Sequence, residues 1–228
     1  MNWQSITVFQ WQQLMELYSG IAENENKDVS IKAASIITGK TEKQIMGMPL
    51  SEIYELSEKL NFVHTEIPTK KINYISVNGK RYRCNYNIKD MEAARYIETK
   101  HFTSDFQSNI HKIAASMVIP QKLTLLGWKD DKYDARKHDQ YAEDLLSASI
   151  TDVMGSVVFF YLVFKTWIKV FRDYLKKEIM KAGMKEYQAE MTIQVLCDTM
   201  DGFIKPNWLR TMRKLHLKNP LNFQQSTF

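Results

Sequence analysis

The sequence predicts a predominantly α-helical α+β fold, a helical bundle with one β-hairpin at about residues 72–88 and a basic C-terminal tail. Three observations support this prediction. Apolar residues recur at helical spacing along most of the chain, an Asn-Gly pair separates two segments of alternating apolar residues, and the last residues are basic without an acidic one. With 44% hydrophobic and 25% charged residues among 228, the composition is that of a globular chain with a sizeable core.

The pattern divides the chain into three regions. Residues 1–120 are expected to form an N-terminal helical domain that contains the hairpin, and residues 139–201 a helical region with a long aromatic helix. Residues 202–228 form the basic tail. Between them, the segment from Gln121 to His138 is expected to be a loop, longer than most connections in compact domains.

The first helix is expected to begin after Thr7, which is a suitable N-cap, and to end at Gly20. Trp3 to Ile6 precede it and are expected to form a short strand or an extended lead-in, which would give the hairpin a partner to pair with. The first helix has one apolar face, made by Val8, Trp11, Leu14, Met15 and Tyr18.

The next helices are joined by a Thr-Gly-Lys-Thr turn that resembles part of a phosphate-binding loop. Such a loop needs a glycine five positions before Gly39, where Ala34 stands, and a strand before the motif instead of a helix. We therefore expect a helix-to-helix turn, in which Gly39 ends one helix and Thr41 caps the next. A further helix is expected over 50–62, after Pro49.

The hairpin prediction rests on Asn78-Gly79. Apolar residues alternate with polar ones on both sides of this pair, and both central positions of a type I′ turn need a positive φ, which Asn and Gly adopt most readily. Helical spacing then resumes, and helices are expected at about 91–97, 106–117, 139–149, 151–181 and 184–200.

The helix over 151–181 is apolar on nearly all sides in its first half, which indicates burial on several sides. Its most apolar stretch, Val153 to Phe164, would rise only about 18 Å against a bilayer core of about 30 Å, so we expect a core helix and no membrane contact. So much apolar surface also favours a homo-oligomer. The expected self-association residues are Val157, Phe160, Phe164, Trp167 and Phe171.

The tail carries the whole excess of positive charge, since five basic residues and no acidic one lie between Gly202 and Phe228 in a chain of net charge +5. Such a segment can contact DNA phosphates or a neighbouring protein, and its apolar residues favour docking to protein. The residues expected to contact a partner or nucleic acid are Lys205, Trp208, Arg210, Arg213, Lys214 and Lys218.

No motif in the sequence indicates an enzyme. The five histidines lack the spacing that places two imidazoles on one helix face for a metal, and the two cysteines are far apart without a CxxC or Cys/His pattern. No G-x-S-x-G nucleophile motif occurs. We therefore expect no catalytic residue, cofactor, metal or small-molecule substrate.

The segment 32–62, KAASIITGKTEKQIMGMPLSEIYELSEKLNF, resembles the tail assembly chaperones of tailed bacteriophages. The layout of residues 1–120, with the NGK(R)Y hairpin and a following DMEAARYIET segment, also resembles small proteins of phage structural modules. Residues 121–228 depart from the chaperone pattern. The resemblance implies a non-enzymatic virion assembly protein, a subunit of a head-to-tail connector or tail ring, whose partners are its own copies and other connector or tail proteins. The alternatives are a tail assembly chaperone absent from the mature virion and a nucleic-acid-binding protein that uses the basic tail. The expected location is the virion, or the host cytoplasm during assembly.

Overall fold

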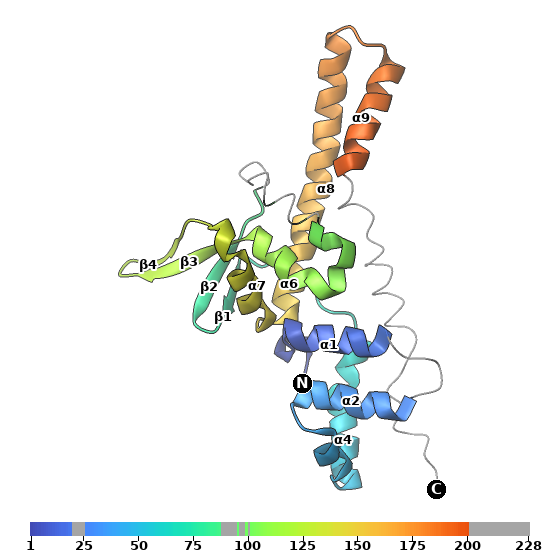
Figure 1. The fold of residues 1–228 in the computed structure, drawn as a ribbon, viewed down its shortest axis with the longest axis vertical. Coiled ribbons are helices and arrows are strands. Elements are labelled where there is room, and N and C mark those ends of the chain that lie inside the picture. The colour runs from blue at the N-terminus through green and yellow to red at the C-terminus, as the bar shows by residue number, and fades with distance from the viewer. Residues whose placement is uncertain (20–25, 88–94, 96–98, 100, 201–228) are drawn as a thin grey trace.

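The computed structural model describes residues 1–19, 26–87, 95, 99 and 101–200 (Figure 1). They form a mainly helical α+β fold with one small antiparallel sheet, as the sequence predicts. The helices are α1 (Val8–Ser19), α2 (Asn26–Thr38), α3 (Glu42–Met46), α4 (Leu50–Leu60), α6 (Phe106–Met117), α7 (His138–Leu146), α8 (Ile150–Lys181) and α9 (Glu186–Met200). Short 3-10 helices lie at Trp3–Ser5, Asn61–His64, Thr103–Asp105 and Ala135–Lys137. The strands are β1 (Tyr74–Val77), β2 (Lys80–Cys84), β3 (Val118–Thr124) and β4 (Gly127–Asp130).

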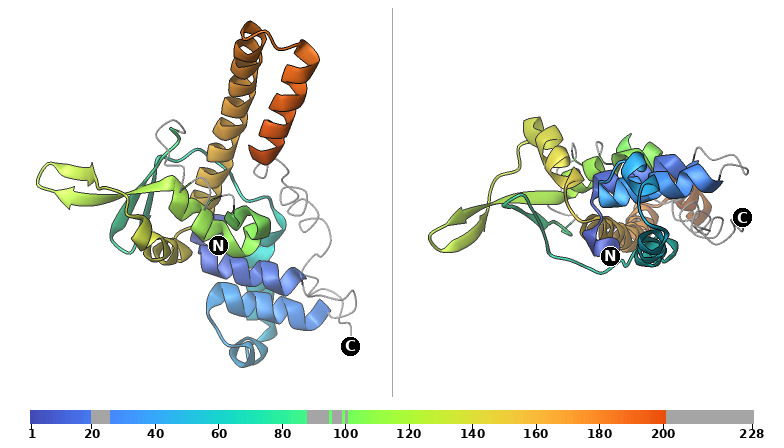
Figure 2. Two further views of the ribbon diagram at one scale, coloured as in Figure 1. Left: turned by 45° about the horizontal axis from the view of Figure 1, so that its top comes forward. Right: turned by 90° about the horizontal axis from the view of Figure 1, so that it is seen from below.

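The fold has a central body from which two hairpins project, one helical and one formed by strands (Figures 1 and 2). The body contains α1, α6, α7 and the first half of α8. The second half of α8 continues out of it and, with α9, forms a helical hairpin that we call the arm; the sheet extends to one side, and α2, α3 and α4 lie below α1 in the view of Figure 1. The sheet and α4 are therefore separate surfaces of one molecule.

The core is built around the first half of α8. Its apolar residues are buried against α6 and the N-terminal segment. The buried residues of α8 are Ile150, Thr151, Val153, Met154, Gly155, Ser156, Val157, Phe160, Tyr161, Phe164 and Ile168, so all but the last lie in its first half. By length and composition alone, α8 also passes as a helix that could cross a membrane, although half of its most apolar window is buried inside the protein.

The N-terminal segment differs from the expectation. Trp3–Ser5 is a 3-10 helix and not a strand, and it does not pair with the hairpin. Trp3 is the buried residue of this turn, and its indole nitrogen donates a hydrogen bond to the carbonyl oxygen of Thr65 over 3.0 Å. Thr7 makes an isolated bridge to Ser149 and thereby ties the start of the chain to the start of α8.

The turn between α2 and α3 confirms the sequence interpretation. Gly39 has a φ of 69°, and the hydroxyl of Thr41 accepts a hydrogen bond from the backbone nitrogen of Gln44 in a capping box. The expected break between α8 and α9 is also found, and Gly183, with a φ of 89°, lies in it. The expected end of the first helix at Gly20 and the helix over 91–97 fall outside the described residues, apart from Arg95.

The sheet contains the predicted hairpin and a second one that the sequence analysis missed. Strands β1 and β2 meet at Asn78 and Gly79, whose φ angles of 49° and 74° are those of a type I′ turn. Strand β2 pairs with β3, which pairs with β4, so the strand order is β1-β2-β3-β4. The prediction of a loop over Gln121–His138, and of a single hairpin, is therefore wrong. The new turn contains Leu125 and Leu126, two consecutive apolar residues that interrupt the alternation expected of a strand pair, and both are exposed.

Candidate protein-binding surfaces

The sheet buries one face and exposes the other. On the inner face Ile75, Val77, Tyr82, Cys84 and Val118 are buried, and the ring of Tyr82 packs edge-on against Tyr141 of α7 at 6.0 Å. The phenol of Tyr82 also donates a hydrogen bond to the carboxylate of Asp144, to which Lys80 is bound as well. These contacts fix the sheet on the body and leave its outer face to solvent.

The outer face presents aromatic and arginine side chains. The guanidinium of Arg81 lies 3.9 Å from the ring centre of Tyr74 and 5.8 Å from that of Trp128, so it bridges two rings on different strands. Arg83 forms an ion pair of 2.7 Å with Asp130, and this hydrogen-bonded pair lowers the pKa of the Asp130 carboxyl. Cross-strand contacts therefore fix the side chains of the outer face in the free protein.

The β3–β4 hairpin ends in an exposed apolar tip. Leu125 and Leu126 form the turn and are fully exposed, and Leu123 is 68% exposed beside Trp128. The turn itself is stabilised by other residues, because Thr124 Oγ1 donates to the carbonyl oxygen of Gly127 over 2.7 Å and Gly127 has a φ of 102°. Turns usually hold polar residues or glycine, and nothing in this one requires leucine.

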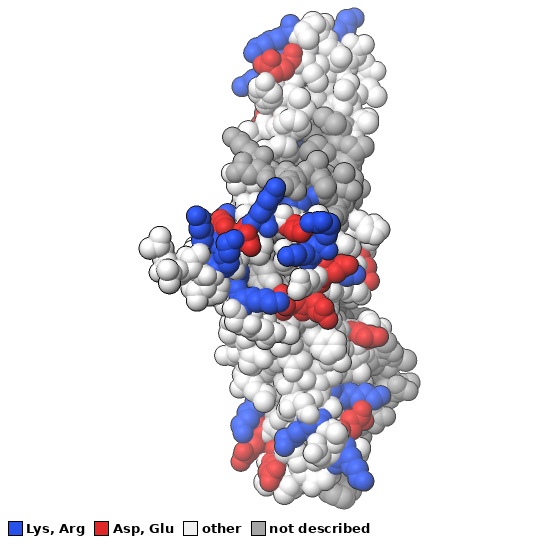
Figure 3. Space-filling model, turned by 60° about the vertical axis from the view of Figure 1, so that its left-hand side comes forward, with Lys and Arg blue, Asp and Glu red and all other residues white. Residues whose placement is uncertain are grey.

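These residues together form one surface, which we call the hairpin surface. Tyr, Trp and Arg are the residue types that contribute most often to binding energy in protein interfaces, and an exposed apolar tip favours the same use. In Figure 3 the tip projects beyond the body, and basic side chains lie behind it with acidic ones among them. The hairpin surface consists of Tyr74, Arg81, Leu123, Leu125, Leu126 and Trp128.

The structure corrects the expected self-association surface on α8. Val157, Phe160 and Phe164 are at most 3% exposed, because they pack into the core of their own chain. Trp167 and Phe171 are partly buried and stack on each other at 5.0 Å between ring centres. The sequence pattern identified an apolar helix correctly, but most of the chosen residues cannot contact a second copy.

The arm exposes other apolar residues. The two helices contact each other through Ala189 and Ile193 of α9, which are buried, and Lys176 of α8 bridges Glu186 and Glu190 at 2.8 Å each. Several apolar side chains of the arm are more than half exposed: Val170, Tyr174, Tyr187, Met191 and Val195.

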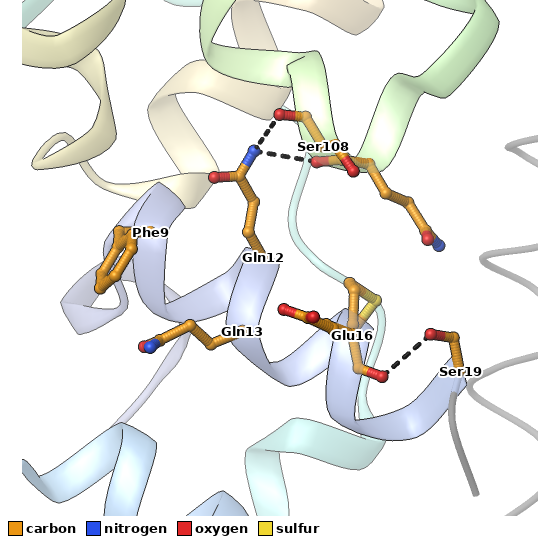
Figure 4. A pocket seen from close by; sticks show the side chains of 8 residues that line it. Phe9, Gln12, Gln13, Glu16, Ser19 and Ser108 are labelled. Carbon is orange, nitrogen blue, oxygen red and sulfur yellow. Dashed lines mark hydrogen bonds between the residues drawn. The ribbon is translucent and has the colours of Figure 1, made fainter.

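A shallow hollow of about 380 Å³ lies between α1 and α6 (Figure 4). The side-chain nitrogen of Gln12 points from α1 toward α6 and donates to the backbone oxygens of Gln107 and Ser108 over 2.9 and 2.8 Å. The same nitrogen lies 3.1 Å from Nδ1 of His111. Burial of the His111 ring lowers its pKa to about 4. The polar groups of this hollow therefore join two helices.

One group of residues has the composition of a hydrolase triad. Nε2 of His138 lies 3.1 Å from the hydroxyl oxygen of Ser116, and Nδ1 lies 3.6 Å from the carboxylate of Asp139. Ser116 is fully buried, however, and its hydroxyl donates to the carbonyl oxygen of Lys112. A nucleophile must reach a substrate carbonyl, so this serine serves the packing of α6 against α7.

Other reactive groups in the described residues are also arranged structurally. Burial raises the pKa of the Cys84 thiol to about 11, which keeps it protonated and a poor nucleophile. No cluster of three metal-ligating side chains occurs within the ranges that the structure describes. The residues expected to bind a partner or nucleic acid in the tail, Lys205, Trp208, Arg210, Arg213, Lys214 and Lys218, lie outside those ranges.

The hairpin surface was missed by the sequence analysis, although one signal for it is present. The segment LTLLGW places a glycine directly after two leucines, and glycine at that position is typical of a short hairpin turn. In comparisons with known proteins, no family model, curated protein or solved structure matches this chain.

Proposed function

We propose that this protein is a non-enzymatic assembly protein of a tailed-bacteriophage particle, a subunit of a head-to-tail connector or tail ring. The observation that carries the proposal is the hairpin surface, where Leu125 and Leu126 are fully exposed at the end of a projecting β-hairpin. A complex that buries these leucines removes their apolar surface from water, and this burial stabilises the complex. Exposed apolar residues of this kind are expected in an assembly protein, because it functions in contact with other subunits.

The phage context is supported by the sequence. The segment 32–62 resembles tail assembly chaperones, and the layout of residues 1–120 resembles proteins of phage structural modules. The non-enzymatic character is supported by the burial of Ser116 and Cys84, the two nucleophiles discussed above. The proposed partners are other copies of the chain and neighbouring connector or tail proteins.

Mass spectrometry of purified phage particles tests this proposal. A connector or ring subunit should be present in a fixed copy number per particle, in proportion to known ring components. A protein that is present in infected cells and absent from finished particles would be the alternative, a tail assembly chaperone. A protein unrelated to phage production, whose removal leaves particle yield and structure unchanged, would contradict both.

A further inference from the structure

We propose that the arms of two copies pack against each other through the outer face of α9, as an antiparallel pair with two-fold symmetry. The outer face consists of Tyr187, Met191 and Val195, which are 68%, 56% and 64% exposed. This inference deepens the proposed function, because it rests on the self-association proposed there. It assigns the contact between copies to a surface that a second copy can reach, unlike the buried rings of α8.

α9 has apolar residues on two opposite sides. Ala189 and Ile193 are buried in the contact with α8. Successive residues of an α-helix are rotated by about 100°, so a residue two positions away lies on roughly the opposite side. Met191 lies two positions from both Ala189 and Ile193, and a spacing of four residues keeps Tyr187 and Val195 on the side of Met191. α8 covers one apolar side of the helix, and within the described ranges the other side is left exposed.

The outer face is also open to a second copy. The arm projects from the body, and α9 lies on the side of α8 that is opposite to the sheet (Figures 1 and 2). A second arm can therefore approach α9 without meeting the sheet or its leucine tip. The contact leaves the hairpin surface available for neighbouring proteins.

The spacing of the outer face is symmetric about its central residue. Tyr187 lies four residues before Met191, and Val195 lies four residues after it. A two-fold axis that passes through Met191 at a right angle to the helix places Met191 against Met191, and Tyr187 of each copy against Val195 of the other. The largest of the three side chains then faces the smallest, so the two helices stay evenly spaced along the contact. A surface that matches itself in this way is the requirement for an isologous contact.

The charges of α9 do not oppose this pairing. From Tyr187 to Val195 the outer face has no charged residue, and the residues that flank it are Gln188 and Gln194. The same two-fold axis places Gln188 of one copy beside Gln194 of the other, and glutamine amides both donate and accept hydrogen bonds. The acids Glu186 and Glu190 lie toward α8, where Lys176 binds both of them.

The alternative arrangements of two arms fit less well. A parallel pair would place Tyr187 against Tyr187 and Val195 against Val195, so the helices would be wedged apart at one end. It would also align the two helix dipoles, whereas an antiparallel pair places the N-terminus of each helix beside the C-terminus of the other. The exposed residues of α8, Val170 and Tyr174, lie on a segment with six basic and two acidic residues between 165 and 181, so two copies of that segment repel each other.

Sedimentation velocity of the full chain over a range of concentrations measures the association. One pair of helices buries less than the roughly 800 Å² per partner of a standard interface, so we expect weak dimers that dissociate on dilution. Met191→Glu places two like charges together at the centre of the contact and should weaken dimerisation at least about 30-fold. The matched control is Leu125→Glu, which introduces the same charge at the exposed hairpin tip and should associate like the parent. Circular dichroism should show native helix content in both variants, since both side chains are exposed.

Oxidative cross-linking tests the orientation of the pair. The background is Cys197→Ser, in which the remaining cysteine, Cys84, is buried. Met191→Cys should form a disulfide-linked dimer by itself, because the two-fold axis brings the two thiols together. Tyr187→Cys and Val195→Cys should each remain unlinked alone and should form a linked dimer when they are mixed. If each of these two variants links to itself instead, the pair is parallel and the inference is overturned.

The remaining outcomes separate this inference from the proposed function. If Met191→Glu associates as well as the parent, another surface joins the copies, which overturns the inference and leaves self-association in place. Association lost only in Leu125→Glu assigns the contact to the hairpin surface and also overturns it. A monomeric parent that dimerises only after removal of residues 202–228 assigns the outer face to the chain's own tail. A parent that is monomeric in every form contradicts self-association itself, while mass spectrometry of purified particles still decides whether the chain is a virion component.

Discussion

Gly155 of α8 lies directly against the backbone of Lys70, so closely that a Cβ atom on Gly155 would be 2.4 Å from the Lys70 carbonyl oxygen. Glycine in a helix interior costs about 1 kcal/mol of stability relative to alanine, so its presence here has a packing reason. The segment before β1 crosses α8 at this point. The close approach therefore joins the connection from the helical lower part to the core helix.

Replacing this glycine should destabilise the protein. Gly155→Ala places a methyl group against a backbone oxygen that cannot rotate away, and we expect the free energy of unfolding to fall by about 1–3 kcal/mol in urea denaturation. The control is Gly47→Ala, where the nearest atom would be 3.4 Å from the Cβ, so stability should change little. An equally stable Gly155→Ala variant would show that the connection does not lie against α8 in solution.

The turn between β1 and β2 gives a second prediction. Gly79 has a φ of 74°, which a β-branched residue resists, so Gly79→Val should lower stability by about 1 kcal/mol or more. Gly79→Asn is the control, because asparagine tolerates the left-handed region, and it should lose less. Thermal melting of the two variants measures the difference, and identical curves for Gly79→Val and the parent would exclude the type I′ turn.

A third prediction concerns pH. His111 is neutral in the folded protein because burial lowers its pKa to about 4, whereas the unfolded chain binds a proton near pH 6.5. Between these two values the unfolded state holds more protons, so stability should fall as the pH falls from 6.5 toward 4, by about 1–2 kcal/mol after allowance for the partial exposure of the ring.

His111→Gln should flatten this part of the stability curve, measured by urea denaturation at several pH values. His101→Gln is the control, since His101 is exposed and its replacement should leave the curve unchanged. A curve that keeps its full slope in His111→Gln would assign the pH dependence to another group.

The aromatic residues of α8 give a fourth prediction, in which they stabilise the fold of their own chain instead of a contact between copies. Phe164 is 1% exposed, so Phe164→Ala should cost about 3–5 kcal/mol of stability through lost burial and a cavity. Leu162→Ala, two positions away and 53% exposed, should cost far less. If Phe164→Ala shifted the association state while leaving the unfolding curve unchanged, the burial of this ring within its own chain would be contradicted.

The last prediction separates the two uses of the basic tail. If the tail binds DNA, removal of residues 202–228 should abolish binding, and log affinity of the full chain should fall with log salt by about 0.7–0.9 per phosphate contacted, or at most roughly 4.5 for five contacts. We expect docking to protein instead, so truncation should weaken assembly while neither form binds DNA in moderate salt. Salt-sensitive DNA binding that truncation removes without loss of assembly would reverse this expectation.

Local sequence signals predicted the elements that depend on local chemistry. Asn78-Gly79, Gly39 with Thr41, and Gly183 each fix a turn through their own backbone preferences, and the structure has those turns at these positions. The first half of α8 was also recognised, because its apolar residues recur on nearly all sides. Fold class therefore followed from patterns within about 15 residues of one another.

The missed parts depend on contacts between distant segments. β3 pairs with β2, about 40 residues earlier, and its segment contains Pro120 and an exposed apolar tip, which together obscure the strand pattern. The burial of Phe160 and Phe164 likewise depends on α6 and the N-terminal segment covering them. Sequence pattern shows that a residue is apolar, but only the fold decides whether its own chain or another one covers it.

α8 is one continuous helix with two different levels of protection. One side of the helix is buried in the body as far as Ile168, so the amide hydrogens of this part should exchange with solvent only when the whole protein unfolds. Beyond that point α9 is the element among the described residues that covers the helix, through Ala189 and Ile193. The amides of the outer turns should therefore exchange much faster, because the arm can fray and reform by itself. A partner that binds the arm would slow the exchange of these amides first. Hydrogen-exchange mass spectrometry would therefore locate the binding site without any mutation.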